Sequence, residues 1–275
     1  MDFADTRRDI VEVGRRLWTR GFVASNDGNI SVKVAPDRLL MTPASVSKYD
    51  MTPEMMVVTD LRGQVISAAP GRKPSSEMLM HLVAYEKRPD IGAVVHAHPP
   101  ISTGFAVAGI PLDRAVLAEV VTTLGSIPIA EYGTPSTREL ADSVAPYLRA
   151  HDGLLLANHG ALALGRDLWS AYYKMETIEH FARISFVARQ LGGELLLSRD
   201  EVDRLQELRG SYGIAAPAPI CPDPAPEADG DVVCQIVQAG APSLGPDGGI
   251  RLTYAQLTAL IDEAVRSAIG PRHGD

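Results

Sequence analysis

Apolar residues recur along this chain in two spacings, one typical of helices and one typical of strands. Residues 5–20 carry Ile10, Val13 and Leu17 three or four positions apart, which predicts an amphipathic helix. Further apolar-periodic stretches predict helices from Met78 onward and at 101–107, 137–148, 168–191 and 199–209. Short alternating or continuous apolar runs, bounded by turn residues, predict strands at 30–34, 39–41, 57–59, 64–67, 92–98, 126–130 and 153–159.

Two of these predicted strands end on histidines. His96 and His98 are two positions apart, so a strand places both imidazoles on one face, and His159 ends a second apolar run next to Gly160. A single histidine in such a place is usually an ordinary core residue. Three neutral imidazoles, however, leave a tetrahedral Zn²⁺ an open position, which is the pattern of a catalytic site. Glu77 and Glu119 are the carboxylates that could complete it or act as acid and base.

Polar loops precede several of these elements and suggest an anion site. The loop at 26–31, Asn-Asp-Gly-Asn-Ile-Ser, offers backbone N–H groups and small polar side chains. Ser75 and Ser76 are good N-caps for the helix that begins near Met78, with Glu77 in its first turn, and helix N-termini bind anions. Both features have an ordinary alternative, because such residues also dominate turns and caps.

Composition narrows the function classes. The formal charge of −8 argues against a nucleic-acid binder, and no apolar run approaches the length of a membrane span. The first residues lack the apolar core of a signal peptide, and the two cysteines, Cys221 and Cys234, are too few for a disulfide framework. We therefore expect a cytoplasmic protein that binds neither nucleic acid nor membranes.

The amino-acid composition changes after residue 215. Five prolines fall between Pro217 and Pro226, and a second Pro/Gly stretch follows at 240–249. Thr253 and Gln256 form a capping box before an apolar stripe that continues to Ala268. The expected organisation is a catalytic domain at 1–215, a Pro/Gly-rich linker at 216–249 and an amphipathic helix at 250–275.

Residues 5–214 resemble the class II aldolase/adducin family. The matching pieces are N-D-G-N-I-S (26–31), T-P-A-S (42–45), P-S-S-E (74–77), H-A-H (96–98), N-H-G (158–160) and S-Y-G (211–213). The resemblance implies a single-domain α/β sandwich whose central, mainly antiparallel sheet is flanked by helices. It also implies a homotetramer with active sites at the subunit interfaces.

The family also implies a role for each matching residue. His96, His98 and His159 match the ligands of Zn²⁺, or of another divalent transition metal. Glu77 matches a carboxylate that binds the resting metal and serves as acid and base. The residues that match the phosphate-binding positions are Asn29, Ser45, Ser75 and Ser76. Tyr212 matches a C-terminal tyrosine that reaches the active site.

The implied activity is cleavage of a ketose 1-phosphate, such as L-fuculose 1-phosphate, to dihydroxyacetone phosphate and an aldehyde. Leu117 stands where fuculose aldolases carry a tyrosine that protonates the aldehyde oxygen, and Ala44 replaces a hydroxyl residue. Glu119 lies close to the catalytic glutamate of methylthioribulose-phosphate dehydratases. The alternatives are therefore a dehydratase-like lyase, a sugar-phosphate 4-epimerase, or an adducin-like scaffold, which would lack the full metal set.

The C-terminal segment lies outside the family core and has two interpretations. It is either a helix that packs back on its own oligomer, or a docking peptide. A Pro/Gly tether that ends in a short amphipathic helix resembles the encapsulation peptides of bacterial microcompartment enzymes. In that case residues 250–270 would bind a shell protein or another partner, and the enzyme would lie inside a microcompartment.

Overall fold

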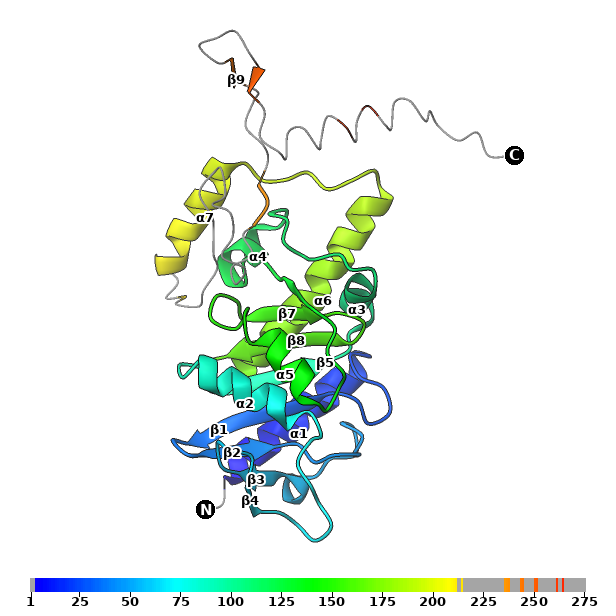
Figure 1. Ribbon diagram of the computed structural model, residues 1–275, viewed down its shortest axis with the longest axis vertical. Coiled ribbons are helices and arrows are strands. Elements are labelled where there is room, and N and C mark those ends of the chain that lie inside the picture. The colour runs from blue at the N-terminus through cyan, green and yellow to red at the C-terminus, as the bar shows by residue number, and fades with distance from the viewer. Residues whose placement is uncertain are drawn as a thin grey trace, which may run out of the picture.

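A computed structural model describes residues 3–211 together with 214, 235–237, 243–244, 250–251, 261 and 264. Its centre is an eight-stranded sheet in the order β4-β3-β2-β1-β5-β8-β7-β6 (Figure 1). Every neighbouring pair is antiparallel except β6 and β7, which are parallel. The strands are β1 (Asn29–Ala35), β2 (Arg38–Met41), β3 (Val57–Thr59), β4 (Val65–Ser67), β5 (Ala93–Ala97), β6 (Ile129–Ala130), β7 (Gly153–Leu156) and β8 (Gly160–Gly165).

Helices cover both faces of the sheet, so the fold is the α/β sandwich that the resemblance implies. They are α1 (Ala4–Thr19), α2 (Met78–Lys87), α3 (Pro100–Val107), α4 (Ala118–Thr123), α5 (Arg138–Val144), α6 (Leu168–Gln190) and α7 (Arg199–Ser211), with a 3₁₀ turn at Pro53–Met55. Apolar residues of α1, α3 and α6 form the core on one face, and those of α2 and α5 form the core on the other. Figure 1 shows α2 and α5 in front of the sheet and α1 and α6 behind it.

Strand alternation decides which side chains reach the site. Along β5, Ala93, Val95 and Ala97 belong to the core under α1 and α6, whereas Val94 belongs to the core under α2. His96 follows Val94 by two positions and therefore faces α2 as well. Asn29 of β1 pairs with His96 across the sheet, so its side chain lies on that same face.

The sequence-based assignment missed one central strand and overestimated two elements. β8, Gly-Ala-Leu-Ala-Leu-Gly, pairs with both β5 and β7 and is buried throughout. The predicted strand at 126–130 is reduced to Ile129–Ala130, and the predicted helix at 137–148 ends at Val144. His180, on α6, is exposed and takes no part in the histidine cluster.

A buried ion cluster ties α2 to β7 and α6. Arg88, at the end of α2, donates 2.8 Å hydrogen bonds from Nη1 to Asp152 and from Nε to Asp90. Asp152 is only 2% exposed, and Lys174 of α6 donates to its other oxygen. Within the described part of the chain, no helix is both long and apolar enough to cross a membrane.

A short part of the predicted linker packs against the body. Ile236 donates a backbone hydrogen bond to Asp113 O and accepts one from Ala115 N, both 2.8 Å long. Val237 packs against the small core between α4 and α7. β9 (Ser243–Leu244) pairs with β10 (Ile250–Arg251), which precedes the predicted capping box at Thr253. Ile261 and Ala264 are helical, whereas the capping box and both cysteines lie outside the described residues.

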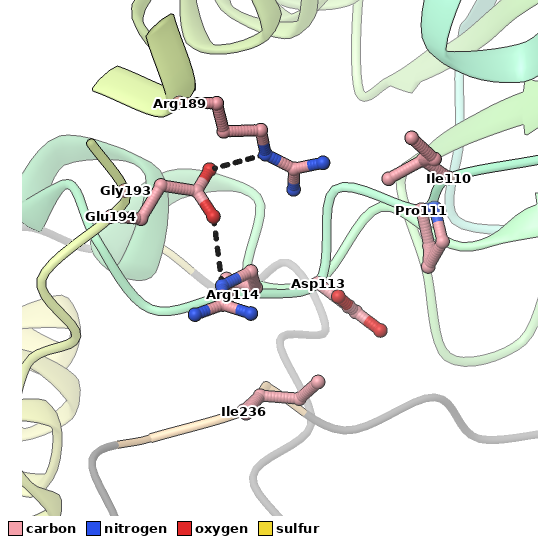
Figure 2. A pocket seen from close by; sticks show the side chains of 8 residues that line it. All are labelled: Ile110, Pro111, Asp113, Arg114, Arg189, Gly193, Glu194 and Ile236. Carbon is pink, nitrogen blue, oxygen red and sulfur yellow. Dashed lines mark ion pairs between the residues drawn. The ribbon is translucent and has the colours of Figure 1, made fainter. Parts of the chain in front are cut away.

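A hollow lies where residues 235–237 meet the body, and none of the three histidines lines it. Its lining residues are Ile110, Pro111, Asp113, Arg114, Arg189, Gly193, Glu194 and Ile236. Figure 2 shows Arg189 and Arg114 approaching the Glu194 carboxylate from two sides, at 3.3 and 2.8 Å. Because the two guanidinium groups are already paired with this buried carboxylate, the hollow has no unpaired arginine to offer an anion.

Candidate metal centre and active site

The three predicted ligand histidines lie together at one end of the sheet. His96 is the penultimate residue of β5, His98 follows the strand, and His159 lies in the turn between β7 and β8. Their ring centroids are 4.8 to 5.0 Å apart, and one nitrogen from each lies within 4.8 Å of the others. The structure therefore brings the H-A-H strand and the N-H-G turn to a single site that could hold a metal ion.

Glu77 supplies a carboxylate to the same site. It is the residue immediately before α2, and it is 8% exposed. Its Oε2 lies 3.3 Å from His96 Nε2, and its Oε1 lies 3.2 Å from His159 Nε2. Oε1 is buried and accepts no hydrogen bond from any described residue. Burial opposes the charge of this carboxylate, but the neighbouring His96 and His159 outweigh burial and hold the pKa of Glu77 well below its usual range.

Three separations among these donor atoms match those around a small divalent cation, and the histidine nitrogens all lie within 4.8 Å of one another. Metal–nitrogen and metal–oxygen bonds of about 2.0–2.1 Å in a tetrahedron put neighbouring ligand atoms about 3.3 Å apart. His96 Nε2 and His98 Nε2 are 3.0 Å apart, and the two carboxylate contacts of Glu77 are 3.2 and 3.3 Å. The donor set of imidazole and carboxylate suits Zn²⁺ and its transition-metal neighbours. The buried Oε1 of Glu77, which lacks a hydrogen-bond partner, is also the atom that such a cation would satisfy.

Surrounding groups set the orientation of two of the rings. The Nδ1 of His96 lies 2.9 Å from the carbonyl oxygen of Ala161, so it carries the proton and leaves Nε2 free as a ligand atom. Asp27 Oδ2 lies 3.5 Å from Nδ1 of His98, so it orients the His98 ring, though from a longer distance. Burial, aided by His96 and His159, lowers the pKa of His98 to about 3 and so keeps this ring neutral.

Two glycines let the backbone approach the histidines. Gly28 has a φ of +71°, and a Cβ there would lie 2.9 Å from the carbonyl oxygen of His96. A Cβ on Gly160 would lie 2.6 Å from both Ala97 O and His98 Cδ2. The glycines of the N-D-G-N and N-H-G motifs are therefore steric requirements of the site.

A buried polar chain behind Glu77 was not predicted from the sequence. Asn29 Nδ2 donates a 2.7 Å hydrogen bond to Glu77 Oε2, and Asn29 Oδ1 contacts His81 Nε2. The other ring nitrogen of His81 lies 2.7 Å from the hydroxyl of Ser31, and Tyr85 donates to the Ser31 carbonyl at 3.0 Å. His81 and Tyr85 are four and eight residues after Glu77, which is the helical spacing that could have revealed them.

The loops predicted to bind phosphate lie next to each other. Ala44 N donates to Lys73 O at 2.9 Å, and Ser75 N donates to Thr42 O at 3.2 Å. Ser45, which has a φ of +58°, and Ser76 are exposed, whereas Ser75 is buried. The side-chain amide of Asn29, by contrast, is taken up by Glu77 and His81.

The helix cap was predicted at the wrong residue. Ser75 and Ser76 were expected to cap α2, but α2 begins at Met78 and Glu77 is its N-cap, without a side-chain capping bond. Ser75 Oγ instead accepts a 3.3 Å hydrogen bond from Glu77 N. The shift has a functional consequence, because it frees the Glu77 side chain to turn toward the histidines.

The remaining candidates lie apart from this cluster or outside the described residues. Glu119 is exposed in the first turn of α4, and no described contact joins its side chain to Glu77 or the histidines. Leu117 is the N-cap of α4 and packs against the main core. Tyr212 lies outside the described residues, so its role stays a prediction.

Comparison with known proteins identifies the family. The profile of the Class II Aldolase and Adducin N-terminal domain matches residues 8–186. The chain belongs to this family. It is 34% identical over 208 residues to a 5-deoxy-D-ribulose 1-phosphate aldolase of Bacillus thuringiensis serovar kurstaki, covering 75% of this chain and 96% of that protein.

Two further relatives agree with this assignment. A 5-methylthioribulose-1-phosphate/5-deoxyribulose-1-phosphate aldolase of Rhodospirillum rubrum is 33% identical over 216 residues, which are 78% of this chain and 96% of that protein. Among solved structures, an L-fuculose 1-phosphate aldolase superposes with a TM-score of 0.70 at 31% identity, covering 74% of this chain and 96% of that one. Relatives of this kind support an aldolase-type lyase acting on a small sugar phosphate.

Proposed function

We propose that this protein is a metal-dependent aldolase that cleaves a deoxyketose 1-phosphate to dihydroxyacetone phosphate and an aldehyde. The observation that carries the proposal is the position of Glu77. A buried carboxylate with one oxygen lacking a hydrogen bond lies against three histidines whose nitrogens are close enough to share one ion. Such a carboxylate can move between holding a cation and holding a proton.

The resident ion would be held by His96, His98 and His159, with Glu77 as a fourth ligand when no substrate is bound. Zn²⁺ is the proposed ion, and another divalent transition metal would suit the same donors. When bound, the ion supplies Lewis-acid stabilisation of the negative charge that develops on the substrate oxygens during carbon–carbon cleavage.

The substrate phosphate is proposed to bind at the paired loops 42–45 and 73–76. Both serines that face solvent there, Ser45 and Ser76, offer hydroxyl groups, and Ser75 stands two residues before the reacting carboxylate, Glu77. The first N–H groups of α2 add the positive end of a helix dipole. Asn29 was predicted as a phosphate ligand, and its engaged side chain limits that role to its backbone N–H.

The protein's own chemistry is proton transfer. Cleavage of the C3–C4 bond leaves its electron pair on C3, and Glu77 delivers a proton to that carbon to give dihydroxyacetone phosphate. In the reverse direction Glu77 removes the same proton. The proton on the C4 hydroxyl must leave as the aldehyde forms, and Tyr212 is proposed for this step because Leu117 has no titratable group at the family's usual position.

The substrate class follows from the relatives and is tested with a panel. Fuculose, rhamnulose, 5-deoxyribulose and 5-methylthioribulose 1-phosphates are incubated with metal-loaded protein, and release of dihydroxyacetone phosphate is measured with and without chelator. We expect release from at least one deoxyketose 1-phosphate and its loss with chelator. No release from any compound by fully loaded protein would reject the proposal.

Substitution of the carboxylate separates its two roles. Glu77→Gln should abolish proton exchange at C3 of dihydroxyacetone phosphate while most of the metal affinity remains with the histidines. Glu86→Gln, on the exposed face of the same helix, is the matched control and should leave exchange unchanged. If Glu119→Gln is more damaging than Glu77→Gln, the dehydratase-like alternative gains over the aldolase.

Assembly and location stay predictions. A homotetramer is expected from the family resemblance, and sedimentation at several protein concentrations checks it. A docking role for residues 250–270, at a microcompartment shell or another partner, is supported by the Pro/Gly-rich composition before them. Deletion of residues 216–275 should then leave the aldolase active, and loss of activity or of the oligomer would contradict the docking role.

A further inference from the structure

The polar chain behind Glu77 runs in one direction only. The charged Glu77 carboxylate can only accept, so the Asn29 amide turns Nδ2 to Glu77 and Oδ1 to His81 Nε2, which must then carry the ring proton. His81 Nδ1 is therefore the acceptor, and the Ser31 hydroxyl donates to it at 2.7 Å. Tyr85 contacts both the carbonyl oxygen and the hydroxyl of Ser31, each at 3.0 Å. A ring that accepts at Nδ1 carries its proton on Nε2, and that atom faces the carbonyl oxygen of Asn29.

The direction matters because the Asn29 amide has two different ends. With its oxygen turned to His81, its NH₂ group faces Glu77 Oε2 at 2.7 Å. In the opposite orientation the amide oxygen would face the carboxylate oxygen, and two acceptors would repel each other at hydrogen-bond distance. The protonated Nε2 of His81 is therefore what keeps the donor end of Asn29 toward Glu77.

Burial makes the arrangement costly to lose. His81 and Ser31 are 0% exposed and Asn29 is 4% exposed, so water cannot replace a missing partner. Burial together with the nearby His96 lowers the pKa of His81 to about 3, so the ring stays neutral and keeps a single proton at ordinary pH.

We propose that His81 is a positioning residue for Glu77, acting through the Asn29 amide. With Oε2 held by Asn29 and 3.3 Å from His96 Nε2, the carboxylate keeps its other oxygen, Oε1, 3.2 Å from His159 Nε2 and without a hydrogen bond. Oε1 is thus the oxygen that would be available to hold a resident ion or to carry the substrate proton. The inference rests on the proposed function for the identity of that proton, but its effect on metal binding is independent of any sugar phosphate.

Two substitutions of His81 separate the bond to Asn29 from the bond to Ser31. His81→Gln places an amide at the level of Nε2 and can still donate to Asn29. His81→Asn places an amide at the level of Nδ1, so it can accept from Ser31 but is too short to reach Asn29. Zn²⁺ alone is the probe, and its dissociation constant is measured on apo protein by competition with a chromophoric chelator. The visible spectrum of the Co²⁺ form reports the coordination of Glu77.

We expect His81→Asn to weaken Zn²⁺ binding by about tenfold, the low end of the cost of losing a residue that orients a metal ligand, and by no more than Glu77→Gln does. His81→Gln still donates to Asn29, so its Zn²⁺ affinity should stay within about threefold of that of the wild type. The Co²⁺ spectrum of His81→Asn should shift toward that of Glu77→Gln. Equal affinities for the two His81 variants would overturn the proposal.

A double substitution tests whether His81 acts through Glu77. In a Glu77→Gln background, His81→Asn should cause no further loss of Zn²⁺ affinity. A further loss of the same size would show that His81 acts on the fold instead. If His81→Asn does not fold, Ser31→Ala removes the donor that holds His81 Nδ1 as an acceptor and should weaken Zn²⁺ binding, whereas Tyr85→Phe should not. Ser31→Ala without effect would also overturn the proposal.

The outcomes keep this inference apart from the aldolase proposal. If the order of Zn²⁺ affinities holds but no ketose 1-phosphate is cleaved, the positioning role stands and the proposed reaction fails. If a ketose 1-phosphate is cleaved while both His81 variants bind Zn²⁺ like the wild type, the reaction stands and the positioning role fails.

Discussion

Lys48 is a buried lysine behind the N-D-G-N loop. Because burying its charge is costly, the protein should become more stable at alkaline pH, where the folded state loses that charge. The side chain is 1% exposed, and Nζ donates to the carbonyl oxygens of Val46 at 2.8 Å and Asn26 at 3.3 Å. Burial lowers the pKa of Lys48 from its ordinary value of 10.5 to about 8, and the nearby charge of Asp27 opposes only part of that effect.

The sign follows from which state holds the proton. Below pH 8 both the folded and the unfolded chain carry the charge, and the folded state bears the full cost of burying it. Between pH 8 and 10.5 the unfolded chain binds more protons, so the free energy of unfolding rises with pH. At about 1.4 kcal/mol per pKa unit, the full rise is about 3 kcal/mol.

The assay is urea unfolding in the presence of chelator at several pH values from 7 to 10.5. The wild type is compared with Lys48→Met, which keeps the length of the side chain without the charge. The variant should be the more stable of the two at pH 7, and the difference should shrink as the pH rises. Lys73→Met, at an exposed lysine, should run parallel to the wild type. A constant difference between the wild type and Lys48→Met, or one that widens with pH, would refute the reasoning.

Three further predictions concern the ion cluster, the site and the C-terminal segment. Asp152→Ala removes the buried carboxylate that Arg88 and the partly buried Lys174 share, and should lower the free energy of unfolding by roughly 3–5 kcal/mol, whereas Asp142→Ala, in an exposed pair, should cost less than about 1 kcal/mol in urea titrations. Gly160→Ala should weaken Zn²⁺ binding at least about tenfold because its Cβ collides with a ligand ring, whereas Gly104→Ala, with open space around it, should not. A chain that ends at residue 215 should be about 2 kcal/mol less stable than one that ends at residue 240, since it loses two backbone hydrogen bonds, and both should bind Zn²⁺ equally.

The histidine cluster could be predicted because its signal is local. His96 and His98 share a strand face by the two-residue period alone, and a glycine after His159 marks a turn where a strand ends. The sheet pairing that brings β5 beside β8 adds only proximity to residues that were already suspected. The motifs along residues 5–214 are local signals too, so they could indicate the family and its α/β sandwich. The structure confirms the sandwich.

The parts that were missed depend on contacts across the fold. β8 is a run of glycine, alanine and leucine without a β-branched residue, so composition did not favour a strand, and it forms because β5 and β7 bind it on both sides. His81 lies on a helix whose apolar spacing indicated only a core face. Its partner Ser31 is 50 residues away in the chain, and only the β1–β5 pairing and the packing of α2 bring them together.

The connections between the loops explain how such a site would select one carbon of the substrate. Ser75 is joined to Thr42 by one hydrogen bond, Thr42 Oγ1 accepts from Ile30 N at 3.1 Å, and the residue before Ile30 anchors Glu77. A phosphate bound at these loops, as proposed above, would therefore lie close to the carboxylate. In a ketose 1-phosphate, C3 is two bonds from the carbon that bears the phosphate, so this short distance favours proton transfer at C3. The far end of the substrate would meet no such constraint from these loops, so they would leave the choice of aldehyde to other parts of the site.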